Sequence, residues 1–215
     1  MKDLLYKEFK LSWHPSVYLI LLCGALLLIP SWPFFIAFGY IFIAFNNVFY
    51  IGRANEDIFF TASLPVRKRD IVRARVCSIA IVELLQVIIA IPFAVINNAV
   101  YTNGNMAGMN TNFAFFGFVL VMYAIFNIIF LPGFYKTAYK IGVPMLLAIF
   151  TLMIFAAAVS VAVVVVPVLE TQLNGLGADH LLGQLPVLAA GILFFVGLTL
   201  LACRISENRF TKVDL

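Results

Sequence analysis

The sequence predicts an all-α membrane protein with six transmembrane helices and both termini in the cytoplasm. Of its 215 residues, 64% are hydrophobic and only 11% are charged, and the mean hydropathy is +1.06. Soluble domains carry roughly a quarter charged residues, and disordered chains are richer in charge and proline, so both classes are excluded. Because each crossing takes about 20 apolar residues, residues 1–215 form a single transmembrane domain with no room for a second, soluble one.

Six apolar stretches support this prediction. The first two are short, and Pro30 and Pro33 break the helix between them, so they are expected to form a tight hairpin with Trp32 at the membrane interface. The fifth is the longest and should tilt or extend past the hydrocarbon. The expected spans cover residues 15–31, 34–51, 77–96, 113–134, 141–168 and 186–203.

The positions of the 14 lysines and arginines predict the orientation. Three precede the first span, six lie between the second and third, two lie between the fourth and fifth, and three follow the sixth. The other three connections contain none, so the positive-inside rule places both termini in the cytoplasm, which five or seven spans would not allow. The residues are Lys2, Lys7, Lys10, Arg53, Arg67, Lys68, Arg69, Arg73, Arg75, Lys136, Lys140, Arg204, Arg209 and Lys212.

Residues 1–14 are expected to form an amphipathic helix in the interface of the inner leaflet. Apolar side chains alternate with lysines that would face anionic lipid headgroups, and Trp13 stands at the expected boundary. The same residues also serve as a simple basic anchor for the topology. The pattern consists of Leu4, Leu5, Phe9 and Leu11 against Lys2, Lys7 and Lys10.

Residues 53–70 form the most informative cytoplasmic segment. Asn55 is the expected N-cap of a short helix, and Pro65 should stop that helix after Leu64. Such a helix exposes Phe59 and Phe60 beside charged residues, which is typical of a surface that binds a protein partner. The alternative is that the two phenylalanines fold back into the inner leaflet.

The two longer connections on the outer side differ in pattern. Residues 97–112 are rich in Asn, Gly and Thr, whereas residues 168–185 alternate leucines with polar residues. The second pattern predicts short helices in the outer interface, broken at Gly175 and Gly177, with a plain loop as the alternative.

The chemistry expected of an enzyme is missing from the sequence. No G-x-x-x-x-G-K-[ST] phosphate-binding loop occurs, and residues 133–137 end in Lys-Thr without the required glycine. His14 and His180 fall on opposite sides of the membrane with no ligand cluster near either, so neither a metal site nor a nucleophile–base pair is expected. No cofactor is therefore expected on this chain.

Glu83 is the ionisable residue expected within the membrane. It lies eight residues past Arg75, which at about 1.5 Å per residue places it roughly 12 Å deep. Such a group faces a translocation pathway or a partner subunit, or it is a protonated, hydrogen-bonded structural residue. Gln86 shares its helix face, and the candidate partners in other spans are Asn46, Asn47 and Asn127.

Residues 61–72, which read Thr-Ala-Ser-Leu-Pro-Val-Arg-Lys-Arg-Asp-Ile-Val, carry a resemblance to a known family. Together with the amphipathic start, the proline-broken hairpin and the upstream acidic pair, they resemble the membrane subunits of bacterial type-2 ABC exporters. The best-fitting subgroup is the small permeases that export amphipathic peptides, such as those for phenol-soluble modulins.

The resemblance implies a dimer of permease chains, identical or different, in the bacterial cell membrane. It implies that the loop between spans 2 and 3 is a coupling helix that docks on a separate ATP-binding subunit, which holds ATP and Mg²⁺. The amphipathic start would match the family's connecting helix. The residues implied at the docking contact are Glu56, Asp57, Phe59, Phe60, Ser63, Leu64 and Pro65.

Three functions follow from these features. The first is an exporter subunit for hydrophobic or amphipathic cargo, namely a peptide toxin, an antimicrobial peptide or a lipid-like molecule. The second is a proton-coupled carrier that uses Glu83, although the sequence shows no convincing internal repeat of the kind such carriers contain. The third is a non-transporting sensor or assembly protein. In each case membrane lipids are partners and nucleic acid is not.

Overall fold

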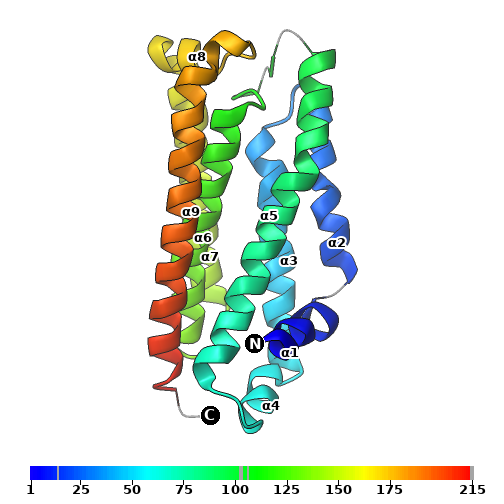
Figure 1. The fold of residues 1–215 in the computed structure, drawn as a ribbon, viewed down its shortest axis with the longest axis vertical. Helices are drawn as coiled ribbons and strands as arrows, with labels where there is room; N and C mark the ends of the chain where they lie inside the picture. Colours follow the sequence, from blue (N-terminus) through cyan, green and yellow to red (C-terminus); the bar gives the residue numbers. More distant parts are fainter. Residues whose placement is uncertain (14, 102–103, 106, 214–215) are drawn as a thin grey trace.

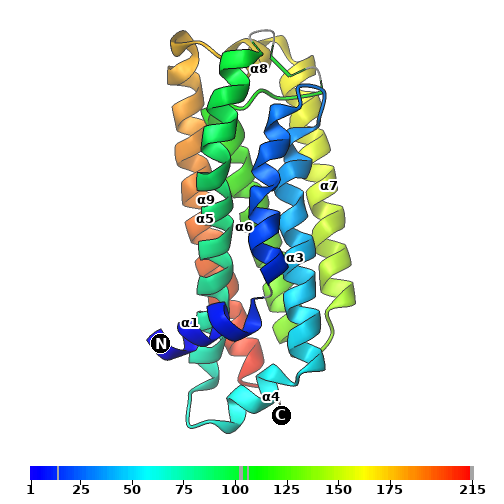
Figure 2. The same ribbon diagram turned by 90° about the vertical axis from the view of Figure 1, so that its right-hand side faces the viewer.

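The computed structural model describes residues 1–13, 15–101, 104–105 and 107–213. The described residues form an elongated bundle of helices and contain no strands (Figures 1 and 2). Met1 and Val213, the two ends of the described chain, lie at the same end of the bundle. We call it the basic end, because all 14 lysines and arginines belong to the segments gathered there. The opposite end is called the α8 end.

Among the described residues, five helices are long and apolar enough to cross a membrane. They are α3 (Phe34–Ala54), α5 (Lys68–Val100), α6 (Phe113–Tyr135), α7 (Gly142–Val165) and α9 (Leu181–Phe210). A sixth candidate is the pair Lys2–Ser12 and Val17–Leu28, which bends by 93° at its break. The predicted helical membrane protein is thus confirmed with five or six spans, whereas the count of six and the cytoplasmic termini stay predictions.

The first predicted span is built from two short pieces, α2 (Pro15–Leu21) and η2 (Leu22–Leu28). The helix ends at Leu28 rather than at residue 31. Ile29 precedes Pro30 and is extended, as the residue before a proline prefers to be. The proline-containing break before α3 lies where the sequence predicts it.

Two helices extend well beyond their predicted bounds. α5 starts at Lys68, so its first two turns carry basic residues that the sequence interpretation placed in a loop, and it continues through Pro92. α9 starts at Leu181 and ends at Phe210, instead of covering 186–203. Backbone hydrogen bonds do not require apolar side chains, so helices extend past the apolar stretches that hydropathy detects.

At the basic end, α1 (Lys2–Lys7) and η1 (Glu8–Ser12) lie across the bundle, and α4 (Asp57–Ser63) lies below them (Figures 1 and 2). The prediction of Asn55 as the N-cap of α4 is wrong. Asn55 closes α3, and Glu56 caps α4 in a left-handed conformation with φ 52°. Leu64 ends the helix before Pro65 as predicted, in the extended conformation. Trp13, predicted at the membrane boundary, is buried against Phe45, with ring centroids 5.7 Å apart.

At the α8 end, the connection carries the short helix α8 (Pro167–Leu173) and a single turn, η3 (Ala178–His180). Asn112 joins the two long connections. Its side-chain carbonyl accepts a hydrogen bond from the Phe115 N–H and caps α6, and its amide donates to the Leu173 carbonyl at 2.6 Å. The connections at this end are therefore fastened to each other and to the start of α6.

The core between α3 and α6 is aromatic. Phe42 stacks on Phe126 at 4.4 Å between centroids, and Phe49 lies edge-on to Phe130 at 4.8 Å. On the other side of α6, α9 runs parallel to it at very close range, because Gly117 and Gly191 face each other without side chains. α6 therefore holds the centre of the bundle, packed between α3 and α9.

Candidate coupling site and intramembrane polar network

α4 presents an apolar face to solvent at the basic end. The exposed fractions are 46% for Phe59, 66% for Phe60 and 43% for Leu64. Of the seven residues predicted for the docking contact, Glu56, Ser63 and Pro65 are also exposed, and Asp57 is half-buried. A helix of seven residues has too little surface to bury two phenylalanines and a leucine by itself.

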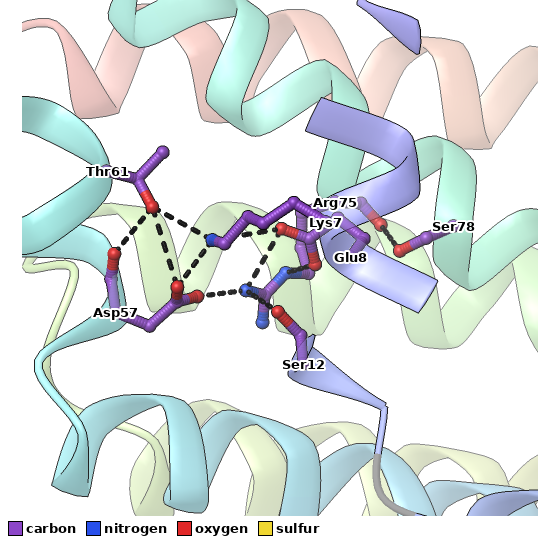
Figure 3. Close-up of polar contacts among 7 residues, drawn as sticks. All are labelled: Lys7, Glu8, Ser12, Asp57, Thr61, Arg75 and Ser78. Atoms are coloured by element: carbon purple, nitrogen blue, oxygen red, sulfur yellow. Dashed lines mark hydrogen bonds and ion pairs between the residues drawn. The ribbon is translucent and has the colours of Figure 1, made fainter. Parts of the chain in front are cut away.

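Asp57 points away from that face, into a cluster of charges (Figure 3). Its carboxylate pairs with the ammonium of Lys7 and, at 2.6 Å, with the Arg75 guanidinium. Lys7 also donates to the hydroxyl of Thr61 at 2.8 Å, and that hydroxyl donates to the Asp57 main-chain carbonyl at 2.7 Å. The first turns of α4 are thereby attached to the N-terminal helix.

Arg75 lies at the centre of the cluster and is 5% exposed. Its Nε forms an ion pair with Glu8, its Nη2 donates to Glu8 Oε1 at 3.3 Å, and the guanidinium lies 5.4 Å from the centre of the Phe49 ring. Two cations and two carboxylates make the cluster neutral. We call Lys7, Glu8, Asp57 and Arg75 the ion-pair cluster; it joins α1, η1, α4 and α5.

The electrostatics of Asp57 follow from this position. Burial of the carboxyl raises its pKa, but the charges and hydrogen bonds of Arg75 and Lys7 lower it by more. The pKa of Asp57 therefore lies below its ordinary value, and the ionised form that holds the cluster together is favoured.

The turn of residues 136–140, which follows α6, packs against the end of α3. Arg53 donates to the Tyr139 hydroxyl at 2.5 Å and stacks over its ring, with 3.7 Å to the centroid. Ala138 takes a left-handed conformation in the turn, with φ 56°. Ala138 and Tyr139 line a small cavity together with Phe59, so this turn borders the exposed face of α4.

Deep in the bundle, polar side chains from α5, α6 and α9 form two hydrogen-bonded groups. Asn127 of α6 donates to Glu83 Oε2 at 2.9 Å and lies 3.2 Å from the Thr199 hydroxyl of α9. Gln86, one turn from Glu83, accepts from the Tyr123 hydroxyl at 2.5 Å and donates to the Ala37 carbonyl of α3 at 3.2 Å. We call these residues the intramembrane polar network.

Only some of the predicted intramembrane residues belong to this network. Glu83, Gln86 and Asn127 come together and are fully buried between helices. Asn46 is half-buried and Asn47 is exposed, and no hydrogen bond found among the described residues links either to Glu83. Glu83 lines neither the cavity beside α4 nor the cavity between α5, α6 and α9 near the α8 end.

Comparison with known proteins decides the family. The model of the family described as ABC-2 family transporter protein matches residues 3–207. The chain belongs to this family. No curated protein and no solved structure gives a significant match.

Membership in the ABC-2 family confirms the resemblance at the level of a type-2 permease. An ABC-2 permease is a membrane subunit of an ABC transporter without enzymatic activity of its own, and it implies an ATP-binding partner. Within the described residues, no group of three or more His, Cys, Asp or Glu side chains is placed to hold a metal ion.

Several residues of this ABC-2 permease were missed by sequence reasoning. Lys7 was interpreted as facing headgroups and Arg75 as a topology residue, and Glu8 was not interpreted as a partner for either. The available signal was Glu8 itself, because an acidic residue within a basic amphipathic helix opposes binding to anionic lipid. Tyr123 and Thr199 gave no signal, since one hydroxyl in a long apolar span is common.

We expect Glu83→Gln to leave this permease folded and Glu83→Leu to destabilise it. Glutamine retains a carbonyl oxygen to accept from Asn127, whereas leucine leaves the buried Asn127 amide without that partner, at a cost of about 1–3 kcal/mol. Thermal unfolding in detergent measures the difference. Transport by Glu83→Gln in proteoliposomes then tests the proton-carrier alternative: abolished transport in a stable protein would favour a proton site, and retained transport would exclude it.

Proposed function

We propose that the chain is the membrane-spanning subunit of an ATP-driven ABC exporter, with α4 as the coupling helix that docks on a separate ATP-binding subunit. Two permease chains would assemble in the bacterial cell membrane, each with six spans and cytoplasmic termini. The cargo would be hydrophobic or amphipathic, such as a peptide toxin, an antimicrobial peptide or a lipid-like molecule, as in the exporters of phenol-soluble modulins.

The observation that carries the proposal is the division of α4 into two faces. Phe59, Phe60 and Leu64 are exposed, while Asp57 is fixed from behind by the ion-pair cluster. An exposed apolar face at a charged end of the molecule favours a protein partner. The buried ion pairs would transmit a push on α4 to α5 and to the N-terminal helix, as a coupling helix requires.

One further feature supports export. The connections at the α8 end are short and hydrogen-bonded to each other, through Asn112 to Leu173 and through Asn110 to Asn174. They offer little surface for a delivery protein on the outer side. The lipid-facing side of α7 carries Leu146, Phe150 and Met153, all largely exposed, which suits either lipid or a second permease chain.

Co-purification tests the proposal. The tagged chain is extracted from its native membranes in mild detergent, and an ATP-binding subunit is expected to accompany the wild type and Phe60→Leu but not Phe60→Asp. Leucine keeps the apolar contact, whereas aspartate places a charge where the partner excludes water. The wild type and both variants should unfold at the same temperature. The Phe60 side chain is largely exposed, so replacing it removes little packing within the bundle.

The same preparations also test whether an amphipathic peptide is a cargo. Reconstituted with its ATP-binding subunit, the wild type is expected to show ATPase activity that rises with an amphipathic helical peptide. Loss of the partner from Phe60→Leu as well as Phe60→Asp would mean that the aromatic ring itself is required. Absence of any ATP-binding subunit from stably extracted wild type would refute the proposal.

A further inference from the structure

A cavity of about 470 Å³ lies between α5, α6 and α9 in the half of the bundle nearer the α8 end. In Figure 1, α5 crosses the bundle obliquely, so its second half diverges from α6 and α9. Ala94, Phe116 and Leu188, one from each helix, line the cavity. The volume is in the range of small-molecule sites, about 300–1,000 Å³.

The chemistry of the lining is graded along the cavity. Val87 and Ile91 line the part nearest the middle of the bundle, and none of the residues that line the cavity is charged. Asn98, Thr111 and Gln184 line the end near α8. One occupant with an apolar tail and a polar head suits both ends.

The cavity opens sideways, toward the surface that faces the membrane. Ile91 and Val95 of α5 line it and are 46% and 62% exposed, as is Phe113 at 46%. These exposed apolar side chains continue the lipid-facing surface of α5. Hydrocarbon of the bilayer is therefore the solvent that reaches the opening.

The length of the cavity matches one leaflet. Val87 and Asn98 are eleven residues apart on α5, which corresponds to about 16 Å along the helix. Half of the hydrocarbon thickness is roughly 15 Å. Val87 also lies at the middle of the expected span of residues 77–96, so the polar end of the cavity falls at the level of the headgroups.

We infer that this cavity binds one acyl chain of a phospholipid from the leaflet at the α8 end. A helix from a second copy, about 10 Å wide and running across the whole bilayer, does not match a groove that ends at the midplane. Water would lack partners along the apolar lining, and an empty groove would forgo dispersion contacts. The acyl chain therefore occupies the groove in the resting protein, whatever cargo the permease moves.

The polar end of the cavity has few free hydrogen-bonding groups, so the identity of the lipid headgroup should have little effect on binding. Asn98 and Thr111 already bond each other, with the Thr111 hydroxyl donating to Asn98 at 2.9 Å and the Asn98 amide donating to the Thr111 carbonyl at 2.8 Å. The Gln184 amide is likewise used by the Gly175 carbonyl at 2.7 Å. With no charge at the rim, zwitterionic and anionic phospholipids should bind alike.

Photolabelling tests the inference. The full chain is reconstituted in phosphatidylcholine vesicles with a trace of phosphatidylcholine that carries a diazirine at the end of one acyl chain, and adducts are mapped by mass spectrometry after illumination. Adducts are expected on Val87 and the other lining residues at the end of the cavity nearest the middle of the bundle. A phosphatidylglycerol probe with the same chain should label them to the same extent.

Variants separate the cavity from the general lipid surface. Ala94→Trp fills the cavity and should reduce labelling of Val87 several-fold, whereas Ile88→Trp, on the exposed side of the same helix, should not. Labelling of Phe150 on α7 reports that each variant is folded and inserted. Ala94→Leu provides a milder filling variant if the tryptophan variant does not fold.

Three results would overturn the inference. Labelling confined to exposed residues such as Ile88 and Phe150 would mean that no chain enters. Undiminished labelling of Val87 in a folded Ala94 variant would mean that the probe reaches it by another route. Cross-links from the lining residues to a second protein chain, in place of lipid adducts, would mean that another copy covers the opening.

Discussion

Replacing Arg75 with methionine is expected to cost the protein about 3–5 kcal/mol of stability, the range found when one partner of a buried ion pair is removed. Methionine fills much of the same space, so the loss is electrostatic rather than a cavity. It leaves the carboxylates of Glu8 and Asp57 at the buried end of α5 with Lys7 as their remaining cation (Figure 3). Thermal unfolding of the purified protein in detergent, monitored by circular dichroism, measures the effect.

Arg73→Met is the matched control. Arg73 also forms an ion pair, with Glu207 at 2.7 Å, and although Glu207 is buried, the Arg73 side chain is about half exposed, so its removal is expected to cost less stability than removal of Arg75. A second comparison uses charge balance: Arg75→Met combined with Glu8→Gln should be less destabilised than Arg75→Met alone. Equal losses in Arg73→Met and Arg75→Met, or no recovery in the double variant, would show that the ion-pair cluster does not stabilise the basic end.

The stability lost in Arg75→Met should depend on pH. The Arg75 charge lowers the pKa of Asp57, so the stability that this pair contributes is present above the ordinary pKa of the carboxyl and is lost as the pH falls through the lowered value. The gap in stability between wild type and Arg75→Met should therefore be largest near neutral pH and narrow in acid. A gap that widened in acid would contradict the assignment.

The cluster also bears on coupling. If α4 is the coupling helix, Arg75→Met should retain its exposed Phe59 and Phe60 and still bind the ATP-binding subunit, while ATP hydrolysis would no longer be linked to transport. Phe60→Asp should lose the partner itself. The two variants thus separate docking from transmission at one short helix.

The contrast between prediction and structure is physical in origin. Hydropathy located the long helices because burial in hydrocarbon depends on composition over about 20 residues, and the helix stop at Leu64 followed from the local rule for residues before proline. The assignment of Asp57 to the docking contact rests on the family resemblance and stays a prediction. The sequence could not show which side chains Asp57 faces, because Lys7, Asp57 and Arg75 are far apart in the chain.

The polar residues within the membrane show the same limit. The i, i+3 spacing of Glu83 and Gln86 predicted a shared face, and Asn127 was one of three asparagines proposed as a partner. Choosing Asn127 over Asn46 and Asn47 requires the packing of α5 on α6 and α9. Composition alone carries no information on which helices become neighbours.

Gly191→Leu is expected to separate α6 from α9 and to destabilise the protein by about 1–3 kcal/mol or more. A Cβ at Gly191 would run into the Gly117 carbonyl oxygen, and a Cβ at Gly117 would lie 2.6 Å from the Val187 carbonyl oxygen and 2.9 Å from the Leu188 Cα. All of these are backbone atoms, which cannot turn aside as a side chain does. Small residues allow this approach between membrane helices, and the contact energy falls steeply once the backbones separate.

Gly197→Leu, two turns further along α9, is the control, because no atom lies within 4 Å of a Cβ built there. Leucine favours a helix more than glycine does and suits a lipid-facing position, so this variant should unfold at or above the wild-type temperature. The clash at Gly191 should also break the Asn127–Thr199 contact at 3.2 Å, since these residues sit further along the same two parallel helices. If Gly191→Leu and Gly197→Leu unfold alike, the close α6–α9 contact is not what holds the centre of the bundle together, and the aromatic packing of α3 on α6 must do so instead.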